Sequence, residues 1–354
     1  MNSLARRMLV VIVVLSVAPA ASAAGLFRAY LSTSGNDANT CTLEKPCRLL
    51  PAALNAVADG GEIWMVDSAN YNTAQVNISK SVTILAVPGS LGSVVATGGG
   101  HGIFINAAGI RVTLRNLVIT RLGSSSDGVS MAQGTQLTVE DCEISNVAGT
   151  GIAAYDTTAG VSIKNTVLRN NNAGFYARGP IVASLDGVHS EGNADSGVYA
   201  DAGSNVTVSN SVLRRNGRGL YAIAAFINID SSHSDYNTTY GVQADDGTAA
   251  SISNSVLAGN GSAGALSSAL TFSFTRITLT RSVVSGGPAG ASVSGGAGTA
   301  QIYVGESIFA SCNTAFTWAG KGGIEGILTY ANNRVTCNTV NSGGSLGNVA
   351  NEIY

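Results

Sequence analysis

Apolar and polar residues alternate along most of the chain in runs of three to five residues, and these runs recur at a regular interval. Clear copies of the repeat begin at residues 161, 206 and 250 and read VSIKNTVLRNNNAG, VTVSNSVLRRNGRG and ASISNSVLAGNGSAG. The shared pattern is apolar-x-apolar-x-Asn/Asp-x-x-apolar, followed by polar residues, Asn and Gly. Alternation with a period of two predicts short β-strands and argues against helices.

One position of the repeat is an Asn or Asp in copy after copy. Its members follow one another at intervals of 20 to 25 residues, and they are Asn116, Asp141, Asn165, Asp186, Asn210, Asp230 and Asn254. The pattern then weakens through Arg281 and Glu306 to Asn333. Asn and Asp tolerate the left-handed backbone of a sharp corner, and stacked amides can hydrogen-bond along the column. We therefore interpret the column as a structural corner.

Repeats of this length cannot bury their own apolar face, so they must stack on one another. Three short strands per repeat predict an all-β solenoid, a parallel β-helix of about ten coils that rise by ~4.8 Å each. The expected organisation is a signal peptide over 1–23, an N-terminal cap segment over 24–60, the β-helix over 61–340 and a C-terminal tail over 341–354.

The first residues have the composition of a secretory signal. Arg6 and Arg7 precede an apolar run from Met8 to Val17, and Ala21-Ser22-Ala23 fits a cleavage site. The alternative is an uncleaved N-terminal anchor. We expect a secreted or periplasmic protein with no membrane insertion after the signal is removed.

Five cysteines follow this segment. Cys41 and Cys47 bracket a short loop that a disulfide could close. Cys312 and Cys337 lie one repeat apart, which predicts a disulfide between neighbouring coils because their backbones can approach to about 5–6 Å. Cys142 is left over. No His lies at zinc-ligand spacing from a Cys, so we expect no metal site.

The composition of the chain excludes two classes of protein. The 354 residues are 45% hydrophobic and only 11% charged, with a net charge of -2. The chain can therefore bury a core, and it lacks the basic surface that nucleic-acid binding requires. The 44 glycines show no triplet period and there are only 6 prolines, which excludes a collagen-like structure.

Strand alternation separates inward from outward residues. In the run that begins at Gly197, Val198 and Ala200 should point inward and Tyr199 outward. Two outward columns follow, one with Ala153, Tyr176, Tyr199, Tyr221 and Gln243, the other with Tyr155, Arg178, Asp201, Ile223 and Asp245. This surface either binds sugars through its aromatic and polar groups or stabilises the sheet through same-face neighbours. The adjacent Asp246 is expected to lie in a turn.

Weaker candidates for acid–base catalysis lie elsewhere in the repeat. His189 and His233 are placed two coils apart at a position that usually points inward, since Ile144, Leu168, Leu213 and Leu257 share it. Glu191, Arg215 and Asp235 fall five residues after the corner in three consecutive coils, which favours an ion-pair ladder over a catalytic cluster. His101 is expected to be a loop residue far from the acids.

Two features resemble the right-handed parallel β-helix superfamily, also called pectin lyase-like. From Ala29 onward the chain reads AYLSTSGNDANTCTLEKPCRLLPAALNAVADGGEIWMVDSANY and then VNISKSVTIL, which looks like the entry module of secreted bacterial β-helix proteins. The second feature is the Asn-Ser-x-apolar repeat itself. The resemblance implies a right-handed solenoid with a short N-terminal helix, whose apolar face of Leu49, Leu54 and Val57 caps the core.

The superfamily includes pectate lyases, polygalacturonases, alginate epimerases and lyases, phage tailspikes and adhesins, and fold does not choose among them. The aspartate and histidine motifs of polygalacturonases and the acidic calcium cluster of pectate lyases have no match here. We therefore expect no cofactor, with calcium as the alternative, although the sequence has no clear site for it. The favoured hypothesis is binding or processing of a polysaccharide or cell-surface glycan. If the protein is an enzyme, the resemblance implies a polysaccharide lyase or glycoside hydrolase. The alternative is a non-catalytic structural or adhesive envelope protein.

Overall fold

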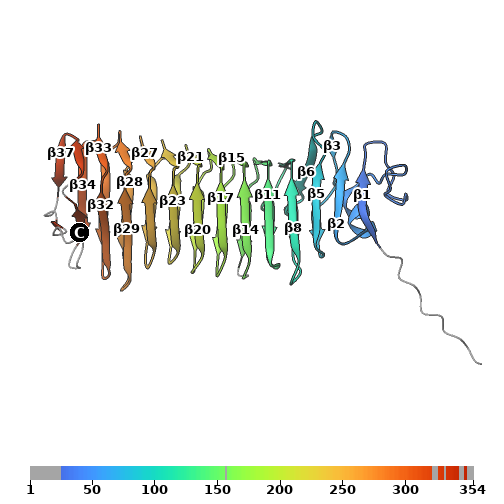
Figure 1. Cartoon of the computed structure of the whole chain (residues 1–354), viewed down its shortest axis with the longest axis horizontal. Coiled ribbons are helices and arrows are strands. Elements are labelled where there is room, and N and C mark those ends of the chain that lie inside the picture. The colour runs from blue at the N-terminus through green and yellow to red at the C-terminus, as the bar shows by residue number, and fades with distance from the viewer. Residues whose placement is uncertain (1–24, 156–157, 321–325, 331, 343–346, 349–354) are drawn as a thin grey trace, which may run out of the picture.

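The chain winds into a rod of stacked β-coils (Figure 1). The computed structural model describes residues 25–155, 158–320, 326–330, 332–342 and 347–348. The predicted signal peptide lies outside these residues, as does most of the predicted C-terminal tail. The expected parallel solenoid is confirmed, and it is slightly longer than ten coils because two of its three sheets contain 12 strands in the described part of the chain.

The first sheet, sheet A, runs the whole length of the rod. Each strand pairs in parallel with its counterpart in the next coil, for example Val161 with Ala183 and Ile163 with Leu185. Its 14 strands are β1 (Leu26–Leu31), β2 (Val57–Met65), β5 (Val82–Ala86), β8 (Arg111–Arg115), β11 (Gln136–Glu140), β14 (Gly160–Lys164), β17 (Val182–Asp186), β20 (Asn205–Ser209), β23 (Phe226–Asp230), β26 (Ala249–Ser253), β29 (Phe274–Thr280), β32 (Thr299–Gly305), β35 (Gly326–Thr329) and β38 (Gly347–Asn348).

The second sheet, sheet B, is built mostly from strands of three residues, each directly after a corner. Its 12 strands are β3 (Ala69–Asn70), β6 (Gly92–Thr97), β9 (Leu117–Leu122), β12 (Glu143–Ser145), β15 (Val167–Arg169), β18 (His189–Glu191), β21 (Val212–Arg214), β24 (His233–Asp235), β27 (Val256–Ala258), β30 (Val283–Ser285), β33 (Ile308–Ala310) and β36 (Arg334–Thr336).

The third sheet, sheet C, closes each coil. Its 12 strands are β4 (Val76–Ile78), β7 (Ile103–Ile105), β10 (Val129–Met131), β13 (Thr150–Tyr155), β16 (Ala173–Arg178), β19 (Ser196–Asp201), β22 (Arg218–Ile223), β25 (Tyr240–Asp245), β28 (Ala263–Ala269), β31 (Ala289–Gly295), β34 (Thr314–Gly320) and β37 (Thr339–Ser342).

The core runs along the axis of the rod and is made of columns of stacked apolar side chains. In sheet A, fully buried branched residues from consecutive coils lie directly above one another, because the strands pair in register. Burial of each such side chain stabilises the folded state by about 1.5–3 kcal/mol. One column consists of Ile84, Leu114, Val139, Ile163 and Leu185.

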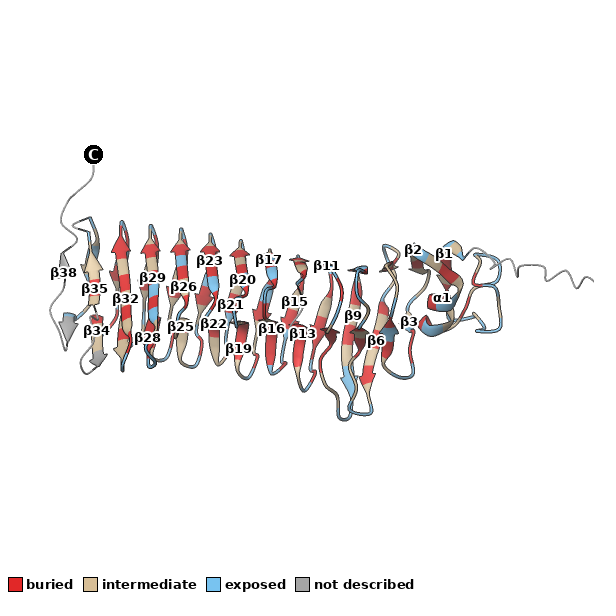
Figure 2. Cartoon of the chain, turned by 90° about the horizontal axis from the view of Figure 1, so that it is seen from below, coloured by how far each residue is buried: buried red, intermediate tan, exposed pale blue. Residues whose placement is uncertain are grey.

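Helix α1 (Leu50–Ala56) covers the N-terminal end of this core beside β1 (Figure 2). Pro51 lies in its first turn, where a missing N–H costs nothing. The helix buries Leu50, Ala53 and Leu54. Of the predicted apolar face, Leu54 and Val57 are buried, whereas Leu49 is the half-buried N-cap residue.

The predicted corner column is right in most coils and wrong in two. Asn116, Asp141, Asn165, Asn210 and Asn254 have left-handed φ values of 47° to 55°. In the other two coils the left-handed residues are Gly187 and Ser231, one position after the predicted Asp186 and Asp230.

The two aspartates still hydrogen-bond to a corner asparagine, although each is the last residue of the preceding strand. The Oδ1 atom of Asp186 accepts a hydrogen bond from Asn210 Nδ2 at 2.8 Å. Asp230 Oδ1 accepts one from Asn254 Nδ2 at 2.7 Å. In these two coils the carboxylate one residue before the corner takes the hydrogen-bonding role of the corner amide. The left-handed backbone itself is adopted by Gly187 or Ser231.

A second, buried asparagine column was not predicted. From Asn193 onward, each member accepts a hydrogen bond from the backbone N–H of the member in the preceding coil, for example Asn193 N–H to Asn216 Oδ1 at 2.9 Å. Asn171 Oδ1 accepts one from the Val147 backbone N–H at 3.1 Å. The signal was present in the repeat as the Asn near its final Gly. The members are Asn171, Asn193, Asn216, Asn237 and Asn260, all buried.

Both predicted disulfides are present. Cys41 pairs with Cys47, with their Cα atoms 4.6 Å apart, and Cys312 pairs with Cys337 across neighbouring coils at 4.8 Å. Cys142 is buried and unpaired among the described residues. Burial raises its pKa to about 12, so its thiol stays protonated.

Candidate functional site

Four tyrosines lie together on the outer surface of sheet C, and we call them the tyrosine face: Tyr155, Tyr176, Tyr199 and Tyr221. The last three occupy the same position of consecutive strands, as predicted. Their ring centroids are 4.7 Å and 4.9 Å apart, with the planes inclined by 39° and 30°. Tyr155 meets Tyr176 edge to face at 5.5 Å. The repeat thus delivers one aromatic ring per coil.

The neighbouring outward column also has the predicted register. Tyr155, Arg178, Asp201, Ile223 and Asp245 follow one another in β13, β16, β19, β22 and β25. This column also hydrogen-bonds to the tyrosine face, because the Tyr176 hydroxyl donates to Asp201 Oδ2 at 3.2 Å. Since neighbouring tyrosines stack on one another, ring edges, hydroxyls and flanking charges are the groups left for a ligand.

Arginines supply positive charge at both ends of the tyrosine face. The Arg218 guanidinium lies 4.0 Å from the Tyr221 ring centroid and 2.7 Å from Asp195 Oδ1. The Arg178 guanidinium lies 5.7 Å from the Tyr155 ring centroid. Both distances fall within the range of cation–π attraction.

All four phenols keep their protons near neutral pH. Burial raises the pKa of Tyr176 to about 12, and the negative charge of Asp201 acts in the same direction. Burial likewise raises the pKa values of Tyr155, Tyr199 and Tyr221. Each hydroxyl can therefore both donate and accept a hydrogen bond.

Asp245 and Asp246 have separate roles, as the sequence predicted. Asp245 belongs to the outward column but is only 8% exposed. Its Oδ2 accepts a bond from Gln243 Nε2 at 2.8 Å, whereas its buried Oδ1 has no partner among the described residues. Burial raises the pKa of this carboxyl. Asp246 lies in the turn, where its Oδ1 accepts a bond from the Thr271 backbone N–H at 2.9 Å.

The prediction that His101 is far from the acids is wrong. His101 does lie in a loop, but its Nδ1 is 3.4 Å from Asp127 Oδ2. The same oxygen accepts a hydrogen bond from the Tyr155 hydroxyl at 3.2 Å. One turn of the solenoid separates residues 101 and 127, so it places them in neighbouring coils. Sequence reasoning missed Asp127 because the loop before β10 does not follow the repeat.

The predicted inward position of His189 and His233 is also wrong. Both side chains are exposed on sheet B, and both pair in register with Val212. The inward positions belong to Ser190 and Ser234, which pair with Leu213. The cause is the corner of these two coils, which lies one residue later than predicted and therefore shifts the inward and outward assignment.

The same shift corrects the predicted column of Glu191, Arg215 and Asp235. Glu191 is in register with Arg214, and Arg214 with Asp235. Arg215 occupies the following corner with a φ of 53°, although it still pairs with Glu191 at 2.8 Å. Hydrogen bonding from Arg214 lowers the pKa of Glu191. Glu191 therefore pairs with both arginines on sheet B, away from the tyrosine face, whereas Asp235 Oδ2 lies 3.2 Å from His233 Nδ1.

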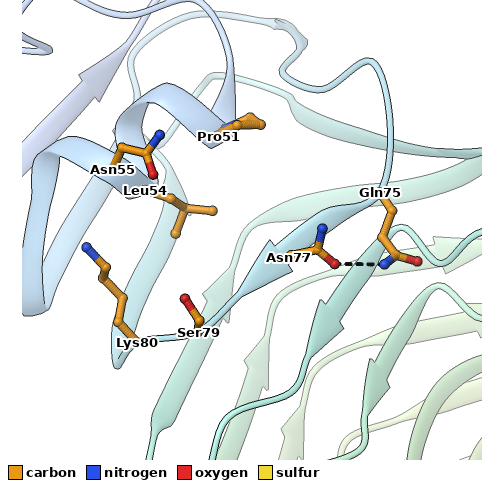
Figure 3. Close-up of a pocket in the computed structure, with 7 residues that line it drawn as sticks. All are labelled: Pro51, Leu54, Asn55, Gln75, Asn77, Ser79 and Lys80. Atoms are coloured by element: carbon orange, nitrogen blue, oxygen red, sulfur yellow. Dashed lines mark hydrogen bonds between the residues drawn. The ribbon is translucent and has the colours of Figure 1, made fainter.

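A small pocket lies between helix α1 and the first coils (Figure 3). Its volume is about 160 Å³. Three of the polar side chains around it, those of Gln75, Asn77 and Lys80, bond to the protein itself. Gln75 Nε2 donates to Asn77 Oδ1 at 2.7 Å, Gln75 Oε1 accepts from the His101 backbone N–H at 2.9 Å, and Lys80 Nζ donates to the Val57 carbonyl at 2.9 Å. The pocket therefore belongs to the capping structure.

The described residues contain no group of three or more His, Cys, Asp or Glu side chains placed to hold a metal ion. No helix within this part of the chain is long and apolar enough to cross a membrane.

Comparison with known proteins agrees with the fold. Residues 101–234 match the family model described as right handed beta helix region. The A-module of the mannuronan C-5 epimerase AlgE4 from Azotobacter vinelandii is similar with a TM-score of 0.65 and 12% identity, over 82% of this chain and 91% of that one. No curated protein sequence matches the chain.

Two other solved structures share the architecture. Pectate lyase Pel9A superimposes with a TM-score of 0.53 and 14% identity, covering 92% of this chain and 80% of that one. The catalytic unit of a GH87 α-1,3-glucanase from Streptomyces thermodiastaticus gives 0.59 and 12%, covering 84% and 66%. At these identities the similarity establishes the fold alone, and the chain is a right-handed parallel β-helix protein.

Proposed function

We propose that the tyrosine face binds an extended glycan that lies along the axis of the rod. The observation that carries the proposal is the in-register series Tyr176, Tyr199 and Tyr221, which repeats once per coil. The coil spacing of ~4.8 Å is close to the length of one sugar unit in an extended chain. A polymer with a regular repeat can therefore make the same contact in each coil.

The chemistry of this surface suits sugars. Protonated tyrosine hydroxyls and the carboxylate of Asp201 offer donors and acceptors for sugar hydroxyls, and ring edges offer apolar contact. The similar structures described above, a mannuronan epimerase, a pectate lyase and an α-1,3-glucanase, are named for action on polysaccharides. The two disulfides support a location in the periplasm or outside the cell, because disulfides persist in oxidising compartments.

A structural or adhesive rod is the second candidate. The contacts within the tyrosine face favour this candidate. Its rings stack on one another, and the Tyr176 hydroxyl already donates a hydrogen bond to Asp201. In that case the tyrosines stabilise the sheet as same-face neighbours.

Substitution of the central ring separates the two functions. Tyr199→Ala should weaken binding to a polysaccharide at least tenfold in affinity electrophoresis across a panel of acidic and neutral glycans. The matched control is Tyr236→Ala, because Tyr236 is 67% exposed in a turn outside sheet C. Circular dichroism verifies that both variants fold. Equal affinities for wild type and Tyr199→Ala, or no binding by the wild type to any glycan, would favour the structural rod.

A further inference from the structure

The loop that connects β28 to β29 presents three large apolar side chains to solvent. Phe272 is 95% exposed, and Leu270 and Phe274 are each more than half exposed. The coil that contains this loop has 27 residues between register partners of β26 and β29, against 23 residues between those of β23 and β26. The loop therefore extends beyond the preceding coil, and we call it the apolar loop.

The polar residues of the apolar loop are bound to the rod. Asp246 Oδ1, in the preceding coil, accepts hydrogen bonds from the Thr271 backbone N–H at 2.9 Å, from Thr271 Oγ1 at 3.0 Å and from Ser273 Oγ at 3.2 Å. The apolar residues alternate with these two polar residues and remain exposed. One carboxylate thus orders the loop before any partner is present, which lowers the entropy that binding would cost.

A shallow groove on the outer surface of sheet A lies beside the apolar loop. Its volume is about 280 Å³. Ala249 and Ser251 of β26 form the floor, where the neighbouring strands carry larger side chains. The exposed ring of Phe226 lines one side, and Arg276 lines the other, two residues after Phe274 in the same strand.

The sides of the groove suit an aromatic side chain. The Phe226 ring can pack against another ring, and a guanidinium attracts the face of an aromatic ring. Within the part of the chain that the structure describes, the Arg276 guanidinium makes no ion pair that would compete with this contact. The groove is smaller than the ~300–1,000 Å³ of typical small-molecule pockets, so it fits a single side chain.

We propose that the protein forms a two-fold symmetric dimer in which Phe272 of each copy inserts into the sheet A groove of the other copy. The loop and the groove are neighbours on one surface, so a single two-fold axis makes both contacts at once. This inference does not depend on glycan binding, because it uses no residue of the tyrosine face.

The exposed apolar area matches a weak but specific dimer. A buried aromatic side chain removes ~150–250 Å² from water, so the exposed parts of Phe226 and of the three apolar loop residues offer roughly 500 Å² per copy. Both copies together would bury about 1,000 Å², which is the lower limit for a specific interface. We therefore expect a dissociation constant on the order of micromolar.

Sedimentation velocity of the full chain after signal removal, over a range of protein concentrations, measures the dimer. Phe272→Ser should weaken dimerisation by about 100-fold or more, because two-fold symmetry removes a buried ring from two contacts. Phe27→Ser is the matched control, since Phe27 is exposed on β1 at the other end of the rod. Its dimerisation should equal that of wild type, and circular dichroism verifies that the variants fold.

A second variant fills the groove. Ala249→Trp adds apolar surface but occupies the space that Phe272 would enter, so dimerisation should weaken by about tenfold or more. Non-specific adhesion of apolar surfaces predicts the opposite, because this variant exposes more apolar area. A dimer of Ala249→Trp that is as tight as wild type, or tighter, would overturn insertion into the groove.

The remaining outcomes identify other occupants. A wild-type protein that is monomeric at every concentration, or equal dimerisation by wild type and Phe272→Ser, overturns the proposal. Phosphatidylcholine–phosphatidylglycerol vesicles test a lipid surface: vesicle binding by monomeric wild type that Phe272→Ser abolishes would assign the apolar loop to a membrane instead. Glycan binding by monomeric wild type that Ala249→Trp abolishes would assign the groove to the glycan and also overturn the dimer.

Discussion

The buried asparagine column should account for much of the stability of the middle coils, and Asn216→Ala tests it. Asn216 is fully buried. Its Oδ1 accepts the Asn193 backbone N–H at 2.9 Å, and its Nδ2 donates to the Ser190 carbonyl at 3.0 Å. Alanine removes both partners and leaves a buried donor and a buried acceptor without hydrogen bonds.

The magnitude follows from these two groups. Each buried polar group that loses its partner costs about 1–3 kcal/mol, so Asn216→Ala should lower the free energy of unfolding by about 2–6 kcal/mol. Urea unfolding followed by circular dichroism measures the change. Asn228→Ala is the control, because Asn228 is exposed on β23 and surface substitutions usually change stability by less than about 0.5 kcal/mol. A loss below about 1 kcal/mol for Asn216→Ala would refute the reasoning.

Two other predictions concern stability. Replacing Cys312 and Cys337 by Ser opens a loop of 25 residues and should cost about 3.5 kcal/mol by loop-closure entropy, against about 2.2 kcal/mol for the 6-residue loop of Cys41 and Cys47. Urea unfolding of the two double variants gives the comparison, and a larger loss from the shorter loop would contradict it. Burial raises the pKa of Asp245 above 3.8, so the folded chain keeps a proton that the unfolded chain releases, and stability falls as the pH rises from about 3.8 through the raised pKa. Asp245→Asn should therefore raise the urea midpoint at neutral pH and have little effect in acid below that range. An equal effect of Asp245→Asn at both pH values would show that ionisation of Asp245 is not the cause.

Much of the architecture could be predicted because the repeat reports the environment of each strand directly. Period-two alternation identifies the inward residues of β17 and β20, and the spacing of Cys312 and Cys337 identifies residues one coil apart. The tyrosine face was also predictable, since Tyr176, Tyr199 and Tyr221 recur at one place in the alternation.

The errors on sheet B came from corners, where several residue types adopt the same left-handed backbone. Gly187 and Ser231 take the left-handed conformation that Asn takes in other coils. A one-residue shift at a corner reverses inside and outside for the strand that follows, and this single shift moved His189 and His233 to the surface.

The sequence by itself determined the solenoid, its outward columns and its two disulfides, because each depends on a period that is visible along the chain. Only the tertiary structure decided which side chains meet between coils. Asp127 lies in an irregular loop, and its contacts with His101 and Tyr155 depend on the length of every turn between residues 101 and 155. Local pattern sets the direction of a side chain, but the register between coils sets its neighbours.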